Sequence, residues 1–127
     1  AVIQVTSAEQ FLALAAENPY GYYRLEGNLD FSAIAPQQGS YLPQRFVGII
    51  DGNGYEVTGL QAPLFGDLQY AQITNLTVEQ PSLSTGAQAV LAVKTRQVIL
   101  GNVSVQGGDG QLPLVKTKID GYYQYTQ

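Results

Sequence analysis

The residues best suited to chemistry are carboxylates around a glycine-rich stretch: Asp51 and Glu56, with Glu26 and Asp30 upstream. Two carboxylates about 5–10 Å apart can hydrolyse a glycosidic bond, one as the acid and the other as nucleophile or base. Asp51, however, opens the sequence Asp51-Gly52-Asn53-Gly54, a tight-turn signal in which aspartate commonly accepts local amide hydrogens. The turn role is therefore favoured for Asp51, and a carbohydrate-active enzyme is the alternative.

The same turn offers oxygen ligands that could hold calcium. An EF-hand loop needs an oxygen ligand at its fifth position and a glutamate at its twelfth. Counted from Asp51, these positions hold Tyr55 and Ala62. The EF-hand is excluded and an irregular, weak site is left open, so no metal ion and no cofactor is assigned.

Two residue types that dominate catalytic sites are missing from the sequence. The chain has no cysteine, which excludes disulfides, thiolate metal sites and a cysteine nucleophile. It has no histidine, which removes histidine general bases, Ser-His-Asp triads and most zinc sites. We therefore expect no enzyme activity from this chain.

Basic side chains are few. Ten acidic and six basic residues give a net charge of −4, whereas nucleic-acid binding normally needs a basic stripe that displaces counterions from phosphates. The densest basic stretch contains Lys94, Arg96, Lys116 and Lys118. Lyase chemistry on acidic sugars could use such residues, but a solvated face is favoured. No nucleic-acid partner is expected.

Tyrosines gather near both ends of the chain. Tyr20, Tyr22 and Tyr23 lie in the first third, and Tyr122 and Tyr123 lie close to the end. Exposed tyrosines stack on sugar rings or anchor protein interfaces. These five residues are the candidate binding residues, although tyrosines that pack on the core with their hydroxyls in water are the favoured interpretation.

Short strands must position most of these side chains. The 127 residues have the length of one domain, so a single domain over 1–127 is expected. Only 13 % of the residues are charged, and the 14 glycines and nine tyrosines favour turns and strands over a helical bundle.

One helix is expected near the start, over residues 7–17, with Ala8 to Glu17 as its body. Thr6 and Ser7 can cap it, because their hydroxyls can accept amide hydrogens of the first turn. The sequence Asn18-Pro19 ends it, since the residue before proline is pushed out of the helical region.

Residues 20–127 predict short strands broken by turns, with an irregular loop over 35–43. Strands are expected at 22–25, 29–31, 46–50 and 55–60. Short apolar segments recur at 63–65, 89–92 and 112–115.

A weak internal repeat predicts how these strands stack. Asn75-Leu76-Thr77-Val78 resembles Asn102-Val103-Ser104-Val105, 27 residues later, and spacings in the twenties are typical of solenoid coils. Leu76 should then lie over Val103, and Val78 over Val105. The predicted fold is mostly β, a right-handed β-helix or solenoid with one N-terminal capping helix; a β-sandwich is the alternative.

Both repeat units also match the N-glycosylation pattern. Because Asn75 and Asn102 fall at equivalent positions, a ladder of stacked asparagines is the favoured interpretation.

Residues 20–105 resemble a recurring segment of large bacterial surface proteins. The matching stretches are 23–30 (YRLEGNLD), 46–55 (FVGIIDGNGY), 63–66 (PLFG) and 73–76 (ITNL). The segment occurs in the N-terminal regions of streptococcal zinc metallopeptidases that cleave immunoglobulin A1, and related segments carry the glycine-leucine-rich GLUG repeat. The family's peptidase activity needs a His-Glu-x-x-His helix, which this histidine-free chain lacks, so the resemblance implies a β-helical module and no catalytic residues.

The sequence thus predicts a non-catalytic scaffold or recognition module of a secreted or surface-located bacterial protein. Flanking domains of a larger chain are the expected partners, with a host protein or a glycan as further possibilities. No apolar run reaches the roughly 18 residues of a membrane span, and no methionine starts the sequence, so the chain is expected to be part of a larger protein. A glycan-binding domain and a small partner-protein-binding domain are the alternatives.

Overall fold

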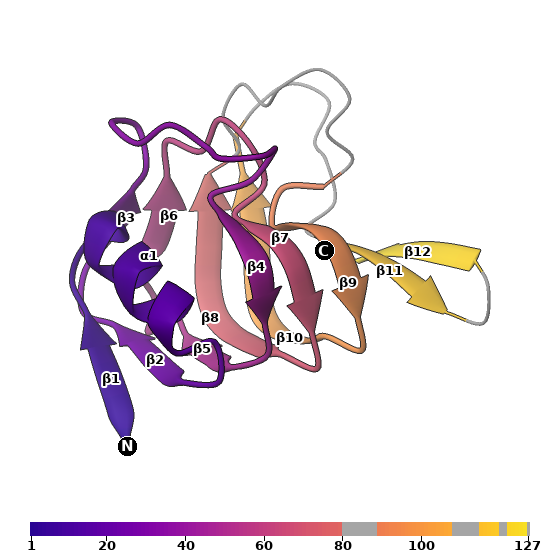
Figure 1. Cartoon of the computed structure of the whole chain (residues 1–127), viewed down its shortest axis with the longest axis horizontal. Helices are drawn as coiled ribbons and strands as arrows, with labels where there is room; N and C mark the ends of the chain where they lie inside the picture. The colour runs from indigo at the N-terminus through magenta and orange to yellow at the C-terminus, as the bar shows by residue number, and fades with distance from the viewer. Residues whose placement is uncertain (80–88, 108–114, 120–121, 127) are drawn as a thin grey trace.

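The computed structural model describes residues 1–79 and 89–107 in full, and the backbone of 115–119 and 122–126. Its elements are mostly strands with one α-helix (Figure 1). In chain order they are β1 (Val2–Val5), α1 (Ala8–Glu17), β2 (Tyr22–Leu25), β3 (Leu29–Asp30), β4 (Leu42–Phe46), β5 (Ile49–Asp51), β6 (Glu56–Thr58), β7 (Phe65–Gln69), β8 (Gln72–Glu79), β9 (Ala92–Arg96), β10 (Ile99–Gln106), β11 (Val115–Ile119) and β12 (Tyr122–Thr126). The prediction of a mostly β chain is confirmed.

The strands form two sheets. The first sheet has the order β1-β2-β5-β8-β6-β3, and β10 pairs with β8. The second has the order β12-β11-β9-β7-β4. The chain alternates between them, since β4, β7 and β9 of the second sheet are followed by β5, β8 and β10 of the first. The chain therefore adds one strand to the second sheet and then one to the first, and we call each such passage through both sheets a circuit.

Pairing between the named strands is parallel except for the antiparallel pair β11 and β12. Sandwiches of the immunoglobulin type are built from antiparallel sheets, so this pairing does not fit the β-sandwich alternative. The predicted register is confirmed, because Leu76 pairs with Val103 and Val78 with Val105. The third apolar segment, 112–115, lies largely outside the described residues.

Four aromatic rings fill the space between α1 and the sheets. Phe46 lies 5.2 Å from Phe65, 6.0 Å from Tyr23 and 6.4 Å from Phe11, measured between ring centroids. All four side chains are buried. They come from α1, β2, β4 and β7, so this cluster joins the helix to both sheets.

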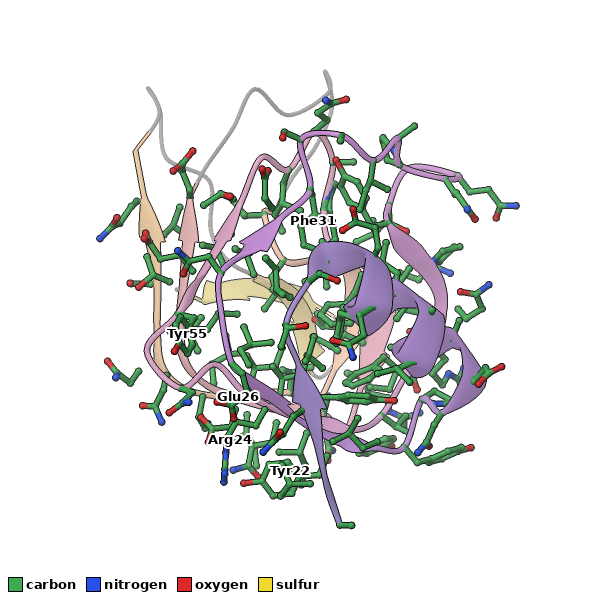
Figure 2. All side chains as sticks on the ribbon, turned by 90° about the vertical axis from the view of Figure 1, so that its left-hand side faces the viewer. Tyr22, Arg24, Glu26, Phe31 and Tyr55 are labelled. Carbon is green, nitrogen blue, oxygen red and sulfur yellow. The ribbon has the colours of Figure 1, made fainter. Side chains whose placement is uncertain are left out.

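Helix α1 begins and ends where the sequence predicts. The hydroxyl of Ser7, the N-cap, accepts the amide hydrogen of Gln10 at 3.1 Å. The Gln10 side chain reaches back to the amide of Thr6, one residue before the cap, at 2.7 Å, in a variant of the capping box. The helix buries Ala8, Phe11 and Ala15, packs against β4, and lies across the end of the sheets that faces the viewer in Figure 2.

The sequence misplaced one strand. The predicted loop over 35–43 and strand over 46–50 are wrong in their bounds, because β4 occupies Leu42–Phe46 and the chain turns at Val47 and Gly48 before β5. The sequence did not predict β4 because it contains Pro43, and proline has no amide hydrogen to donate to a neighbouring strand. The register with β7 shifts between Leu42 and Arg45, which accommodates the proline.

Replacement of Phe46 by alanine should lower the free energy of unfolding by about 3–5 kcal/mol, because it opens a cavity where three other rings meet. Urea unfolding followed by circular dichroism measures the change. Tyr20→Ala is the control, since that side chain is 78 % exposed and should cost less than about 0.5 kcal/mol. Equal losses in the two variants would contradict the role of the cluster.

Candidate functional site

Asp51, the leading catalytic candidate, is engaged on both of its oxygens. One accepts the backbone amide hydrogen of Asn53 at 2.9 Å, and the other lies 3.4 Å from Nε of Arg24. Arg24 is its neighbour in the ladder between β2 and β5. The turn role predicted for Asp51 is confirmed, and the ion pair holds the carboxylate against the sheet.

The other candidate carboxylates lie on different elements and do not form a cluster with metal-binding potential. Asp30, on β3, accepts the amide hydrogen of Ser32 at 2.9 Å, and this bond lowers the pKa of the Asp30 carboxyl. Glu56 begins β6, where its backbone amide donates to the Asn28 side chain at 2.9 Å. Within the residues that the structure describes, no three or more His, Cys, Asp or Glu side chains are grouped to hold a metal ion.

The tyrosines predicted as binding residues have different fates. Tyr20 is 78 % exposed, and Tyr22, on β2, is 37 % exposed. Tyr22 lies near the bottom of the view in Figure 2. The side chains of Tyr122 and Tyr123 lie outside the described part. Tyr23 is wrong as a binding residue, because its side chain is fully buried.

Tyr23 instead ties β2 to the end of α1. Its hydroxyl donates toward the carbonyl oxygens of Asn18, at 2.6 Å, and Leu14, at 3.0 Å. The Leu14 carbonyl also accepts the Asn18 amide hydrogen at 2.8 Å, and the Asn18 carbonyl accepts that of Gly21 at 3.4 Å. The phenol is thus a second donor to each of these carbonyls at the end of the helix. Burial raises the pKa of Tyr23 above its ordinary value.

Asparagines lie where the chain bends within the first sheet. Asn53, Asn75 and Asn102 all have positive φ, at 53°, 55° and 55°. Asparagine tolerates this left-handed conformation better than most residues. At the same turn, a Cβ on Gly52 would collide with the carbonyl oxygen of Asn75, so only glycine fits there.

The predicted asparagine ladder is present at this turn. The Asn102 amide donates to the side-chain oxygen of Asn75 at 3.0 Å, and the hydroxyls of Thr77 and Ser104, two residues further along the strands, lie 3.4 Å apart. Identical or similar side chains therefore stack in adjacent circuits.

Sequence reasoning missed a group of charged residues on the second sheet. Arg45, Asp67 and Lys94 are partners in the ladders of β4, β7 and β9. Arg45 and Asp67 form an ion pair of 3.3 Å. These residues are 22 or 27 positions apart, so only the register of the strands brings them together.

The chain is similar to a defined region of bacterial proteases. Residues 5–107 match the family described as M26 IgA1-specific metallo-endopeptidase N-terminal region. The immunoglobulin A1 protease of Streptococcus sanguinis is 29 % identical over 114 residues, 84 % of this chain and 6 % of that protein. That of Streptococcus pneumoniae strain R6 is 28 % identical over 85 residues, 62 % of this chain and 4 % of that protein. No solved structure matches the chain.

These observations define a mostly β module of the kind found in the N-terminal regions of bacterial metallopeptidases. The chain belongs to the family of M26 IgA1-specific metallo-endopeptidase N-terminal regions, which confirms the resemblance inferred from the sequence. It spans only 4–6 % of the length of the curated relatives that it matches. Within the described residues, no helix is long and apolar enough to cross a membrane.

Replacement of Asn102 by alanine should cost about 1–2 kcal/mol of stability, because it removes the ladder hydrogen bond and places alanine at positive φ. Asn102→Gly keeps the backbone conformation accessible and should cost less than the alanine variant. Urea unfolding of both variants measures the two losses. A glycine variant that is the less stable of the two would contradict the importance of positive φ at this turn.

Replacement of Tyr23 by phenylalanine should cost about 1–2 kcal/mol, since carbonyls at the end of α1 lose a buried donor. Tyr22→Phe is the control and should change stability by less than about 0.5 kcal/mol.

The stability of the wild-type chain and that of Tyr23→Phe should also depend differently on pH in alkaline solution. Because the pKa of Tyr23 is raised by folding, its contribution is complete below the ordinary tyrosine pKa of 10.0 and is lost as the pH rises through the folded-state pKa. The wild-type chain should therefore lose stability above pH 10 more steeply than Tyr23→Phe. Parallel stability curves would contradict the assignment.

Proposed function

We propose that this chain is a non-catalytic scaffold: a stack of coils in a right-handed β-helix that forms part of the N-terminal region of a larger, secreted or surface-located bacterial protein. The observation that carries this proposal is the ladder between β8 and β10. Seven residue pairs are in parallel register across it, and each partner lies 27 residues further along the chain. One circuit of the chain is thus stacked directly on the next.

The alternation between the two sheets supports the coil assignment. Phe65 pairs with Ala92 in the second sheet and Gln72 pairs with Ile99 in the first, again 27 residues apart. Successive circuits of a solenoid bury their apolar faces against one another, because one circuit cannot form a core alone.

Helix α1 fits the role of a cap on this stack. It precedes β2 as β4 precedes β5, and it packs against β4, the edge strand of the second sheet. The helix therefore takes the position that a strand takes in the later circuits. Terminal units of solenoids commonly differ in structure from the internal ones in this way.

Several observations support a role without catalysis. Asp51 is held by Arg24 and by the amide of Asn53, which leaves it poorly placed as an acid or a nucleophile. The family match is to the N-terminal region of a metallopeptidase, and the names of the relatives, immunoglobulin A1 proteases, are compatible with a protein that acts outside the cell.

Duplication of one circuit tests the proposal. A second copy of residues 72–98 inserted after Val98 should add one strand to each sheet, because it spans one ladder repeat. The longer chain should unfold in one transition, with an m-value higher by about one fifth, and small-angle scattering should show a particle about 5 Å longer.

The control inserts the same 27 residues in scrambled order at the same place. It should leave the m-value unchanged or prevent folding. A duplicated chain that unfolds in two transitions, or whose insert is cleaved by protease before the rest, would overturn the coil assignment. Release of reducing sugar from a polysaccharide, lost on Asp51→Asn and Glu56→Gln, would overturn the absence of catalysis.

A further inference from the structure

The second sheet carries mostly basic charged residues, whereas most of the described acidic residues lie elsewhere. Of the four basic side chains in the fully described residues, three lie on this sheet: Arg45 on β4, and Lys94 and Arg96 on β9. Asp67 is the one acidic residue on β4, β7 and β9. The other described acidic residues lie on or beside α1 and the first sheet: Glu9, Glu17, Glu26, Asp30, Asp51, Glu56 and Glu79.

The backbone register places two further basic residues on a strand of the same sheet. Thr117 of β11 is the ladder partner of Thr95, which lies between Lys94 and Arg96. Lys116 and Lys118 are the neighbours of Thr117 in the sequence. Five of the six basic residues of the chain therefore belong to strands of the second sheet, although the net charge of the chain is −4.

An aromatic ring lies beside these cations. The guanidinium carbon of Arg96 lies 5.5 Å from the ring centroid of Tyr70, which is within the range of a cation–π contact. The Tyr70 amide donates to the Arg96 carbonyl at 2.8 Å, so the backbone fixes the pair. The Tyr70 side chain is nevertheless 54 % exposed and presents apolar surface next to a positive charge.

Asp67 moderates the charge of one part of this surface. It pairs with Arg45 at 3.3 Å and accepts a hydrogen bond from the Gln69 side chain at 2.9 Å. Within the described part of the chain, the two ion pairs are Arg24–Asp51 and Arg45–Asp67. Neither involves Lys94 or Arg96, both of which are exposed.

We propose that this basic face, formed by Arg45, Lys94, Arg96 and Tyr70, binds a polysaccharide that bears carboxylate groups. Lysine and arginine form charge-assisted hydrogen bonds with carboxylates, and a tyrosine ring packs on the apolar side of a sugar. β4, β7 and β9 lie side by side (Figure 1), and strands in a sheet are about 4.8 Å apart. The cations are therefore spread across an extended surface, which suits a polymer better than a small anion. This binding function goes beyond a scaffold and does not depend on the coil assignment.

Affinity electrophoresis in gels that contain polygalacturonate or hyaluronan tests the proposal. The wild-type chain should be retarded by at least one of these polymers, and the retardation should fall as salt rises. The double variant Lys94→Gln/Arg96→Gln should bind at least tenfold more weakly, whereas Asp67→Asn should bind more tightly because it frees Arg45. Retardation by neither polymer would overturn the proposal.

Matched controls separate this face from general charge effects. The single variant Lys94→Gln removes one positive charge from the basic face and should weaken binding, whereas Arg24→Gln removes one positive charge from the first sheet and should bind like the wild type. Tyr70→Ala should weaken binding and Tyr20→Ala should not. Melting temperatures verify that each variant is folded. Equal weakening by Arg24→Gln, equal retardation by neutral dextran, or equal binding to inorganic polyphosphate would each overturn a site specific for carboxylated sugars.

Discussion

Strands β8 and β10 must bend at the same place, because a parallel ladder transmits the position of a bend from one strand to the next. Asn75 and Asn102 meet this requirement with the same backbone conformation and with a hydrogen bond between their side chains. Gly52, directly after β5, leaves room for the carbonyl oxygen of Asn75. The charge pattern of the second sheet and the packing of the core both follow from this shared register, since residues far apart in the sequence meet only when it holds.

The aromatic cluster depends on the same constraint from the inside. Phe46 and Phe65 come from consecutive strands of the second sheet, and their rings can pack at 5.2 Å because both strands present the same side inward. Phe11 reaches the same cluster from α1. These rings form the part of the core that lies beneath the helix, which gives the helix apolar surface to cover.

The sequence predicted those features that local chemistry or exact repetition determines. The hydroxyl caps and the proline defined α1, and the repeated Asn-apolar-Ser/Thr-Val unit predicted the pairing of Leu76 with Val103. Strand β4 was missed, because Pro43 is typical of loops and its ladder depends on a distant partner. Tyr23 was misassigned, because Tyr22 and Tyr23 are the same residue type and point to opposite faces of β2. Only the fold decides which of these faces is buried. The sequence identified Lys94 and Arg96 as part of a basic stretch, but Arg45 and Tyr70 join them only through the register of neighbouring strands.

Helix α1 has a consequence for how the molecule behaves at high concentration. An exposed edge strand offers unpaired backbone groups to any other strand and invites growth of a fibril. Because α1 packs against β4, the edge strand of the second sheet, that edge is shielded from a strand of another molecule. A parallel sheet that could otherwise extend is thereby given a terminus at β4, which disfavours association with another molecule through that edge.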